Sequence, residues 1–173
     1  MTHVIEPASS GRAKCRGCDQ KIAKGELRLG EKLPNPYGEG EMTLWYHPLC
    51  GAFKRPDVLV EAAETTTTEL EDRETLLAEA QHGLAHRRLP RLNGAQKAPT
   101  GRARCRSCKE MISKDTWRFS LVYYEEGRFE PAGYIHVGCA QEYFDTTELM
   151  SRVRHFSPGL DESDLEDLQT QLA

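Results

Sequence analysis

Two sets of cysteine and histidine residues have the types and spacing of metal ligands. In the first set, Cys15 and Cys18 form a Cys-x2-Cys pair, and His47 and Cys50 form a His-x2-Cys pair after 28 intervening residues. Three thiolates and one imidazole are the donors of a tetrahedral zinc site, with Zn–S distances of about 2.3 Å and Zn–N distances of about 2.0 Å. Because four protein ligands leave no position for water, we expect a structural zinc ion and not the catalytic zinc of an enzyme.

The same pattern returns in the second half of the chain. Cys105 and Cys108 are followed, after 27 residues, by His136 and Cys139. A repeat that keeps all four ligands predicts two structural units, and two zinc ions then account for all six cysteines. The alternative of a thioredoxin-like Cys-x2-Cys would need a βαβ surround and leaves the His-x2-Cys pairs unexplained.

The residues around the ligands also match. Residues 10–15 read Ser-Gly-Arg-Ala-Lys-Cys and residues 100–105 read Thr-Gly-Arg-Ala-Arg-Cys; a Leu-Arg pair follows at 27–28 and Trp-Tyr precedes the histidine at 45–46. With the long spacer, this pattern resembles the PARP-type zinc finger, which occurs in tandem in poly(ADP-ribose) polymerase and singly in a eukaryotic DNA ligase. The resemblance implies small α+β, zinc-stabilised domains, each with a short antiparallel sheet, a Cys3His site and a closing helix.

The domain organisation follows from the repeat. We expect finger 1 at residues 9–84, a basic flexible linker at 85–98 and finger 2 at 99–173, after a short flexible lead at 1–8. Each unit is near the size at which a small core needs a metal for stability.

The elements predicted for the first unit come from apolar alternation and turn residues. They are a strand at 22–30 with Arg28 outward, a loop at 32–41, a strand at 42–46, helical turns at 50–54 stopped by Pro56, and a helix at 69–84 with a capping box at Thr68. His82 and His86 near its end lack further ligands, so they are interpreted as surface histidines rather than a metal pair.

The second unit should repeat this plan. Its predicted elements are a strand at 117–124, a hairpin turn at 125–128, a strand at 129–135, a helical start at 139–144, and a closing helix with a capping box at Ser163 and apolar positions at Leu165, Leu168 and Leu172.

Charge is unevenly distributed along the chain. The net charge is −4, yet residues 9–55 carry nine Lys and Arg against five Asp and Glu, and residues 97–119 carry seven against two. The segments that follow are acidic, with three against eight at 56–88 and two against eight at 140–173. This separation of basic and acidic segments favours nucleic-acid binding. The alternative is that both are charged surfaces that face only solvent.

The resemblance implies where DNA would be contacted. In the family, the arginines that match Arg12 and Arg28 lie along the DNA backbone, and a loop matching Leu33 to Met42 presents apolar side chains to the bases exposed at a break. Here Pro36 and Tyr37 form its tip, and Gly38 replaces a bulky residue, for which Met42 or Leu44 would have to substitute. The predicted DNA contacts are Arg12, Lys14, Arg16, Arg28, Pro36, Tyr37 and Met42 in finger 1, and Arg102, Arg104, Arg106, Arg118, Tyr123 and Tyr124 in finger 2.

The aromatic residues divide into two groups. Trp45, Tyr46 and Trp117 are expected to pack in the core beside the metal, whereas Tyr37, between proline and glycine, is expected to be exposed. In finger 2, Glu125 and Glu126 would repel phosphate beside the tyrosines, so the fingers are not expected to contribute equally.

These observations lead to a hypothesis of a non-enzymatic, sequence-independent sensor of DNA strand breaks that works with repair proteins. The alternative is a protein–protein adaptor in which zinc is a scaffold and the acidic helices are the contact face. The sequence shows neither a signal peptide nor an apolar run long enough to span a membrane, so we expect an intracellular, DNA-associated protein.

Overall fold

A three-stranded antiparallel sheet followed by helices recurs in two units. The structure is a computed structural model that describes residues 2–172. The chain divides between Ala85 and His86 into unit 1 and unit 2. No helix in this described part of the chain is both long enough and apolar enough to span a bilayer.

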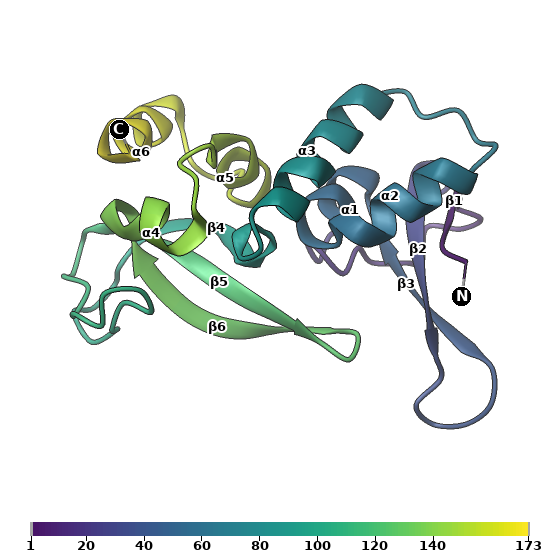
Figure 1. The fold of residues 1–173 in the computed structure, drawn as a ribbon, viewed down its shortest axis with the longest axis horizontal. Helices are drawn as coiled ribbons and strands as arrows, with labels where there is room; N and C mark the ends of the chain where they lie inside the picture. The colour runs from purple at the N-terminus through teal and green to yellow at the C-terminus, as the bar shows by residue number, and fades with distance from the viewer. Residues whose placement is uncertain (1, 173) are drawn as a thin grey trace. The chain divides into compact units, whose positions relative to one another are not determined.

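The sheet of unit 1 has the strand order β1-β2-β3, with β1 (Val4–Pro7), β2 (Leu27–Pro34) and β3 (Glu41–Tyr46) (Figure 1). Three helices follow: α1 (Pro48–Lys54), α2 (Pro56–Thr65) and α3 (Arg73–Ala85). The core forms where Ile5, Leu29 and Leu44 meet the apolar sides of α1 and α2, because alternate strand residues share one face.

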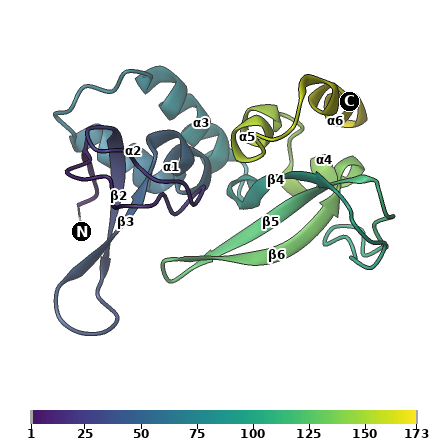
Figure 2. The same cartoon turned by 180° about the vertical axis from the view of Figure 1, so that it is seen from behind.

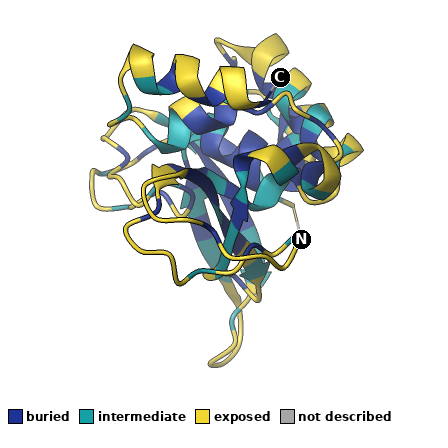
Figure 3. Ribbon diagram, turned by 90° about the vertical axis from the view of Figure 1, so that its left-hand side faces the viewer, coloured by how far each residue is buried: buried dark blue, intermediate teal, exposed yellow. Residues whose placement is uncertain are grey.

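Unit 2 starts with a 3-10 turn, η1 (Leu89–Arg91), and a sheet of order β4-β5-β6 (Figure 2). Its elements are β4 (Leu92–Lys97), β5 (Trp117–Glu125), β6 (Arg128–His136), η2 (Val137–Cys139), α4 (Ala140–Phe144), α5 (Met150–Phe156) and α6 (Glu162–Leu172). Helix α5 packs on β4, and α6 packs on η2 and α5. In Figure 3 the buried residues lie mainly where strands and helices face one another, and exposed residues mark turns and outer helix faces.

Two segments expected to be flexible are strands. The predicted lead contains β1, which pairs with β2, and the predicted linker at 85–98 contains β4, which pairs with β5. Burial explains the difference: Ile5 in β1 and Leu92 in β4 lie in the cores of their units. The prediction of a flexible linker is therefore wrong, since only residues 86–88 separate α3 from η1.

The helix boundaries differ from the predicted ones for local reasons. Pro56 does not stop a helix but begins α2, because proline at the first helical position needs no N–H partner. The predicted capping box at Thr68 does not form: its hydroxyl donates to the carbonyl of Ile5 at 3.3 Å, and α3 begins later, at Arg73. The closing α6 is confirmed, but Asp161 and Asp164 exchange the capping bonds instead of Ser163.

The predicted hairpin of unit 2 is confirmed. β5 and β6 are joined by Glu126 and Gly127, both with positive φ, as a two-residue hairpin turn requires. In unit 1 the strand β2 begins later than expected and continues to Pro34, which shortens the expected loop to residues 35–40.

Candidate metal centres and nucleic-acid interface

Each Cys-x2-Cys pair lies on a turn that aims backbone N–H groups at a sulfur. In unit 1 the N–H groups of Gly17 and His47 both donate to Cys15 Sγ at 3.3 Å. Asp19, just after the pair, adopts a left-handed conformation with φ of 63° that closes the turn. A Cβ at Gly17 would lie 2.8 Å from Cys50 Cβ, so only glycine fits at this point of the first centre.

The remaining ligands arrive from the end of a strand and the first turn of a helix. β3 delivers His47 and α1 carries Cys50, so that His47 Nδ1 lies 3.4 Å from Cys18 Sγ and 3.9 Å from Cys50 Sγ. Tetrahedral bonds of normal length to a zinc ion place sulfur and nitrogen about 3.5 Å apart. The four donor atoms of unit 1 all lie within 4.8 Å of one another. The spacing therefore fits a tetrahedral zinc ion.

Unit 2 repeats this geometry. His136 Nδ1 lies 3.3 Å from Cys108 Sγ and 3.8 Å from Cys139 Sγ, and the four donors again lie within 4.8 Å. The other ring nitrogen, Nε2, donates to the carbonyl of Met111 at 3.1 Å. That bond orients the imidazole and leaves Nδ1 free to bind a metal.

Electrostatics favours one thiolate in each cluster. Burial raises the pKa of Cys18 and Cys139, and the hydrogen bond with Cys15 raises the pKa of Cys50. A hydrogen bond from Cys50 is the main cause that lowers the pKa of Cys15 to about 3. Burial raises the pKa of Cys105, but hydrogen bonds from the backbone of Cys108 and His136 outweigh it and lower that pKa to about 6. A thiol with such a pKa is ionised at neutral pH, which is the form that binds zinc.

The structure brings together all eight predicted ligands in two clusters of four. Three thiolates and an imidazole at these distances match a structural zinc site in donor type, number and geometry. The protein binds two zinc ions, and each would hold a Cys-x2-Cys turn against the end of the sheet in its own unit.

Comparisons with known proteins agree with this geometry. The family model described as "Poly(ADP-ribose) polymerase and DNA-Ligase Zn-finger region" matches residues 6–87. Unit 1 thus matches the PARP-type zinc finger over nearly its whole length. The second cluster and sheet repeat those of the first, so both units are PARP-type, zinc-stabilised domains.

Three curated relatives illustrate the similarity. Poly [ADP-ribose] polymerase 1 of Gallus gallus is 38% identical over 82 residues, which are 42% of this chain and 8% of the relative. The Oryza sativa subsp. japonica enzyme of the same name is 29% identical over 146 residues, 79% of this chain and 14% of the relative. Poly [ADP-ribose] polymerase of Sarcophaga peregrina is 28% identical over 138 residues, 70% of this chain and 14% of the relative. The chain therefore covers no more than about a seventh of these relatives' length.

The predicted DNA-contacting cations fall into two groups. Six are exposed around the Cys-x2-Cys turns, namely Arg12, Lys14, Arg16, Arg102, Arg104 and Arg106. The other two, Arg28 and Arg118, are only 7% and 5% exposed. Arg28 lies on the face of β2 opposite the buried Leu29, as expected, but Trp45 and Glu6 cover it there.

The two buried arginines share one arrangement. The Arg28 guanidinium lies 3.6 Å from the centroid of the Trp45 ring and pairs with Glu6 at 3.3 Å. The Arg118 guanidinium lies 3.5 Å from the centroid of Tyr134, and its Nε and Nη2 donate to Gln96 at 3.2 and 2.7 Å. Stacking on a ring keeps each charge flat against the sheet. Arg118 also lies directly opposite the ligand His136 in the strand pairing.

Sequence reasoning missed the partners Glu6 and Gln96. They lay in segments interpreted as a lead and a linker, although the 90-residue shift that relates Arg28 to Arg118 also relates Glu6 to Gln96. Extending the repeat toward the N-terminus would have found both.

The apolar and aromatic residues among the predicted DNA contacts differ in exposure. Tyr37, at the turn between β2 and β3, is 88% exposed, and Pro36 beside it is also exposed, whereas Met42 is half-buried. In unit 2, Tyr123 is 47% exposed, and Tyr124 is half-buried against Phe129, with ring centroids 5.0 Å apart. Tyr37 is thus the most accessible of these side chains.

The aromatic residues expected in the core are mostly buried there. Tyr46 and Trp117 are buried, and Trp117 Nε1 donates to Asp167 of α6 at 2.7 Å. Trp45 is half-buried on the other face of its sheet, where Arg28 covers it.

Proposed function

We propose that this protein binds DNA without regard to sequence and recognises strand breaks, and that it does so without catalysing a reaction itself. The observation that supports this most directly is the repeated set of six exposed cations around the two zinc-binding turns. Guanidinium and ammonium groups in such an array suit the phosphate backbone, which carries no sequence information. Zinc then acts by holding the cations in place.

Recognition of a break requires contact with a base surface that a continuous duplex hides. Tyr37 offers such a contact because it is exposed at the end of a hairpin, where the N–H of Tyr37 donates to Asn35 Oδ1 at 3.0 Å and stabilises the turn. A base stacked on an aromatic ring contributes about 1–3 kcal/mol. We infer that Tyr37 discriminates broken from intact DNA.

The protein would work inside the cell, associated with DNA and with repair proteins. In this proposal unit 1 supplies the stacking residue and both units supply backbone contacts. The acidic helices face away from the DNA, since acidic side chains would repel phosphate.

A binding panel tests the proposal. The zinc-loaded chain is measured against nicked, gapped, overhanging, blunt and intact duplexes at two salt concentrations. We expect tighter binding to the broken duplexes and a steep loss of affinity with salt, because counterions are released from the backbone. A protein–protein adaptor would show neither a break preference nor a steep salt dependence, and that result would overturn the proposal.

Substitutions separate the two contributions. Tyr37→Ala should reduce the preference for broken DNA by about tenfold and leave weak binding to intact DNA unchanged. Arg12→Gln and Arg102→Gln should weaken binding to all duplexes alike. Lys24→Gln, an exposed charge change outside the predicted contacts, serves as the control. An unchanged preference in Tyr37→Ala would exclude Tyr37 as the stacking residue.

A further inference from the structure

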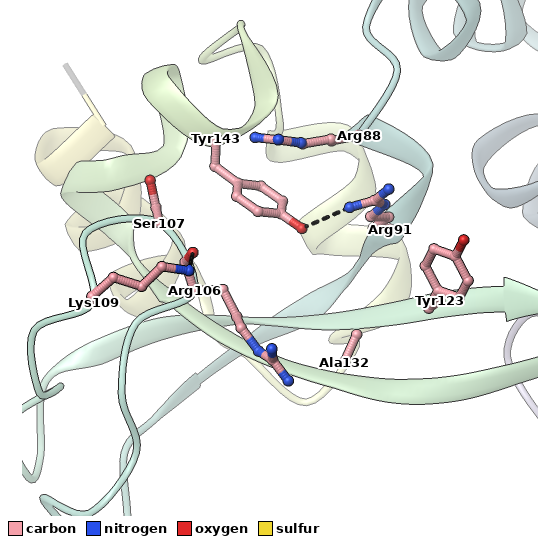
Figure 4. Close-up of a pocket in the computed structure, with 8 residues that line it drawn as sticks. All are labelled: Arg88, Arg91, Arg106, Ser107, Lys109, Tyr123, Ala132 and Tyr143. Atoms are coloured by element: carbon pink, nitrogen blue, oxygen red, sulfur yellow. Dashed lines mark hydrogen bonds between the residues drawn. The ribbon is translucent and has the colours of Figure 1, made fainter.

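Unit 2 contains a cavity lined by cations and tyrosines. It has a volume of about 490 Å³ and is shown with its lining side chains in Figure 4. The lining residues are Arg88, Arg91, Arg106, Ser107, Lys109, Tyr123, Ala132 and Tyr143. They come from the segment before β4, the second Cys-x2-Cys turn, both strands of the hairpin and α4. A cavity of this size is in the range of small-molecule sites and exceeds the needs of a single phosphate ion.

The lining of this cavity carries four cations and no carboxylate. Two tyrosines hold two of the cations in position. Arg91 Nη1 donates to the hydroxyl of Tyr143 at 3.2 Å, and its guanidinium lies 5.3 Å from the ring centroid of Tyr123. The Arg88 guanidinium lies 5.0 Å from the ring centroid of Tyr143. Such contacts reduce the entropy that each arginine loses when it binds an anion.

The remaining two cations belong to the second zinc-binding turn. Lys109 Nζ donates to the carbonyl of Arg106 at 2.8 Å, which places the ammonium group at the same wall of the cavity. Figure 4 shows Arg88 and Arg91 from one side and Arg106 and Lys109 from the other lining the same hollow. Like charges gathered in this way repel one another, so a bound anion of two or more charges would relieve the repulsion.

The wall also offers an aromatic surface. Tyr123 is 47% exposed and borders the cavity, so a planar base can lie against its ring. We propose that this cavity binds a phosphorylated nucleoside, with the phosphate on the guanidinium and ammonium groups and the base or sugar along Tyr123. A free nucleotide and the phosphorylated end of a nucleic-acid strand present the same chemistry.

Two of the side chains that line the cavity have no counterpart at the matching positions of unit 1. Asp19 takes the place of Lys109 and Leu33 the place of Tyr123, so unit 1 has neither the cation nor the ring. Arg88 and Arg91 lie in the segment that the sequence suggested was a linker. In this proposal Arg88 and Arg91 bind the phosphate in the cavity, a role separate from the DNA-backbone contacts proposed for the six exposed cations.

Calorimetry on the zinc-loaded full chain tests the proposal. The probes are deoxyadenosine monophosphate, deoxyadenosine and inorganic phosphate. We expect saturable binding of the monophosphate, weaker binding of phosphate and no detectable binding of deoxyadenosine. The proposal is overturned if the monophosphate binds no better than deoxyadenosine.

Two variants place the binding in the cavity. Arg88→Gln removes one lining charge, and Lys109→Asn removes another with a residue that tolerates the positive φ of 70° at this position. Each should weaken monophosphate binding by about tenfold. Lys114→Gln makes the same charge change outside the cavity and should bind as the parent chain does. Equal effects of all three substitutions would contradict the assignment.

A second experiment shows whether the bound phosphate belongs to a free nucleotide or to a strand end. Its outcome does not depend on the proposed break recognition. Gapped duplexes with a 5′-phosphate or a 5′-hydroxyl are compared in the parent chain and in Arg88→Gln, which leaves Arg106 and Tyr123 intact. A phosphate preference lost in the variant identifies a strand end as the ligand; monophosphate binding without that preference identifies a free nucleotide. The ratio of the affinities for unphosphorylated gapped DNA and for intact DNA tests the proposed function separately.

Discussion

The two zinc-binding units share ligands and sheets but differ in what they bury behind the sheet. Unit 1 buries an ion pair there. Glu31 is only 1% exposed, and its two carboxylate oxygens accept hydrogen bonds from Arg55 Nε and Nη2 at 3.0 and 2.9 Å. The hydroxyl of Tyr46 donates to Glu31 Oε1 at 3.1 Å. This network links β2, β3 and the start of α2.

Unit 2 has the same fold, with apolar residues in place of this network. The residues at the corresponding positions of the repeat are Leu121, Ile135 and Phe144, all of which are buried. The fold therefore does not require the charged network. An ion pair taken out of water gains little over well-packed apolar residues, but one partner left alone is strongly unfavourable. The charged residues of unit 1 therefore depend on one another more than the fold depends on them.

Removal of a zinc ligand should have the largest effect and tests whether the units are independent. Cys15→Ala and Cys105→Ala each remove one thiolate from one cluster. Because zinc contributes about 10–16 kcal/mol to the folding of small zinc domains, each variant should lose one zinc ion and unfold its own unit. Elemental analysis should give one zinc per chain in each variant. Loss of both ions from a single substitution would show that the units fold as one.

The buried ion pair comes next in expected size. Glu31→Leu alone removes the buried carboxylate of Arg55 and leaves only the exposed Asp57 at 3.9 Å, which should lower the free energy of unfolding by about 2–3 kcal/mol. Urea unfolding of the zinc-loaded chain measures the change.

The matching control converts the whole network to the composition of unit 2. Glu31→Leu combined with Tyr46→Ile and Arg55→Phe should restore the free energy of unfolding to within about 1 kcal/mol of the parent chain. If the triple variant is as unstable as Glu31→Leu, the network supports the fold directly and the comparison with unit 2 does not hold.

The zinc ligands could be predicted from sequence because their signal is local. Two short spacings, each repeated, identify the zinc ligands before any fold is known. The hairpin of unit 2 was predicted in the same way, from the turn residues around Glu126 and Gly127. The closing helix α6 was equally visible, since Leu165, Leu168 and Leu172 recur at helical spacing and are buried.

The third strand of each sheet could not be predicted in the same way. β1 and β4 are short, and each pairs with a strand about 20 residues away in the chain, so no local pattern marks them. The burial of Arg28 had the same cause, because its ring partner Trp45 is brought beside it only when β2 and β3 pair. Pairing between strands, rather than the spacing of ligands, determines which cations remain exposed.

Gly51, in the middle of α1, gives a smaller test of the comparison. A Cβ added at Gly51 would collide with Leu29, whereas unit 2 has Ala140 at the matching position. Gly51→Ala should therefore destabilise unit 1 by about 1–3 kcal/mol through overpacking. Thermal unfolding of the zinc-loaded chain measures the loss. Gly38→Ala, where a Cβ meets nothing within 4 Å, should leave the melting temperature nearly unchanged; equal shifts would exclude a steric cause.

The partners of the stacked arginines give the smallest expected effect. Arg28 faces the carboxylate of Glu6, while Arg118 faces the neutral amide of Gln96, so the charge of Arg118 is not offset by its strand partner. Gln96→Glu should lower DNA affinity and Glu6→Gln should raise it, each by up to about fivefold, because a single surface pair contributes about 0.2–1 kcal/mol. Both effects should shrink with added salt, since the Debye length falls to about 8 Å at 0.15 M. Shifts of the same sign, or shifts that do not depend on salt, would show that these side chains act through the sheet and not through their charge.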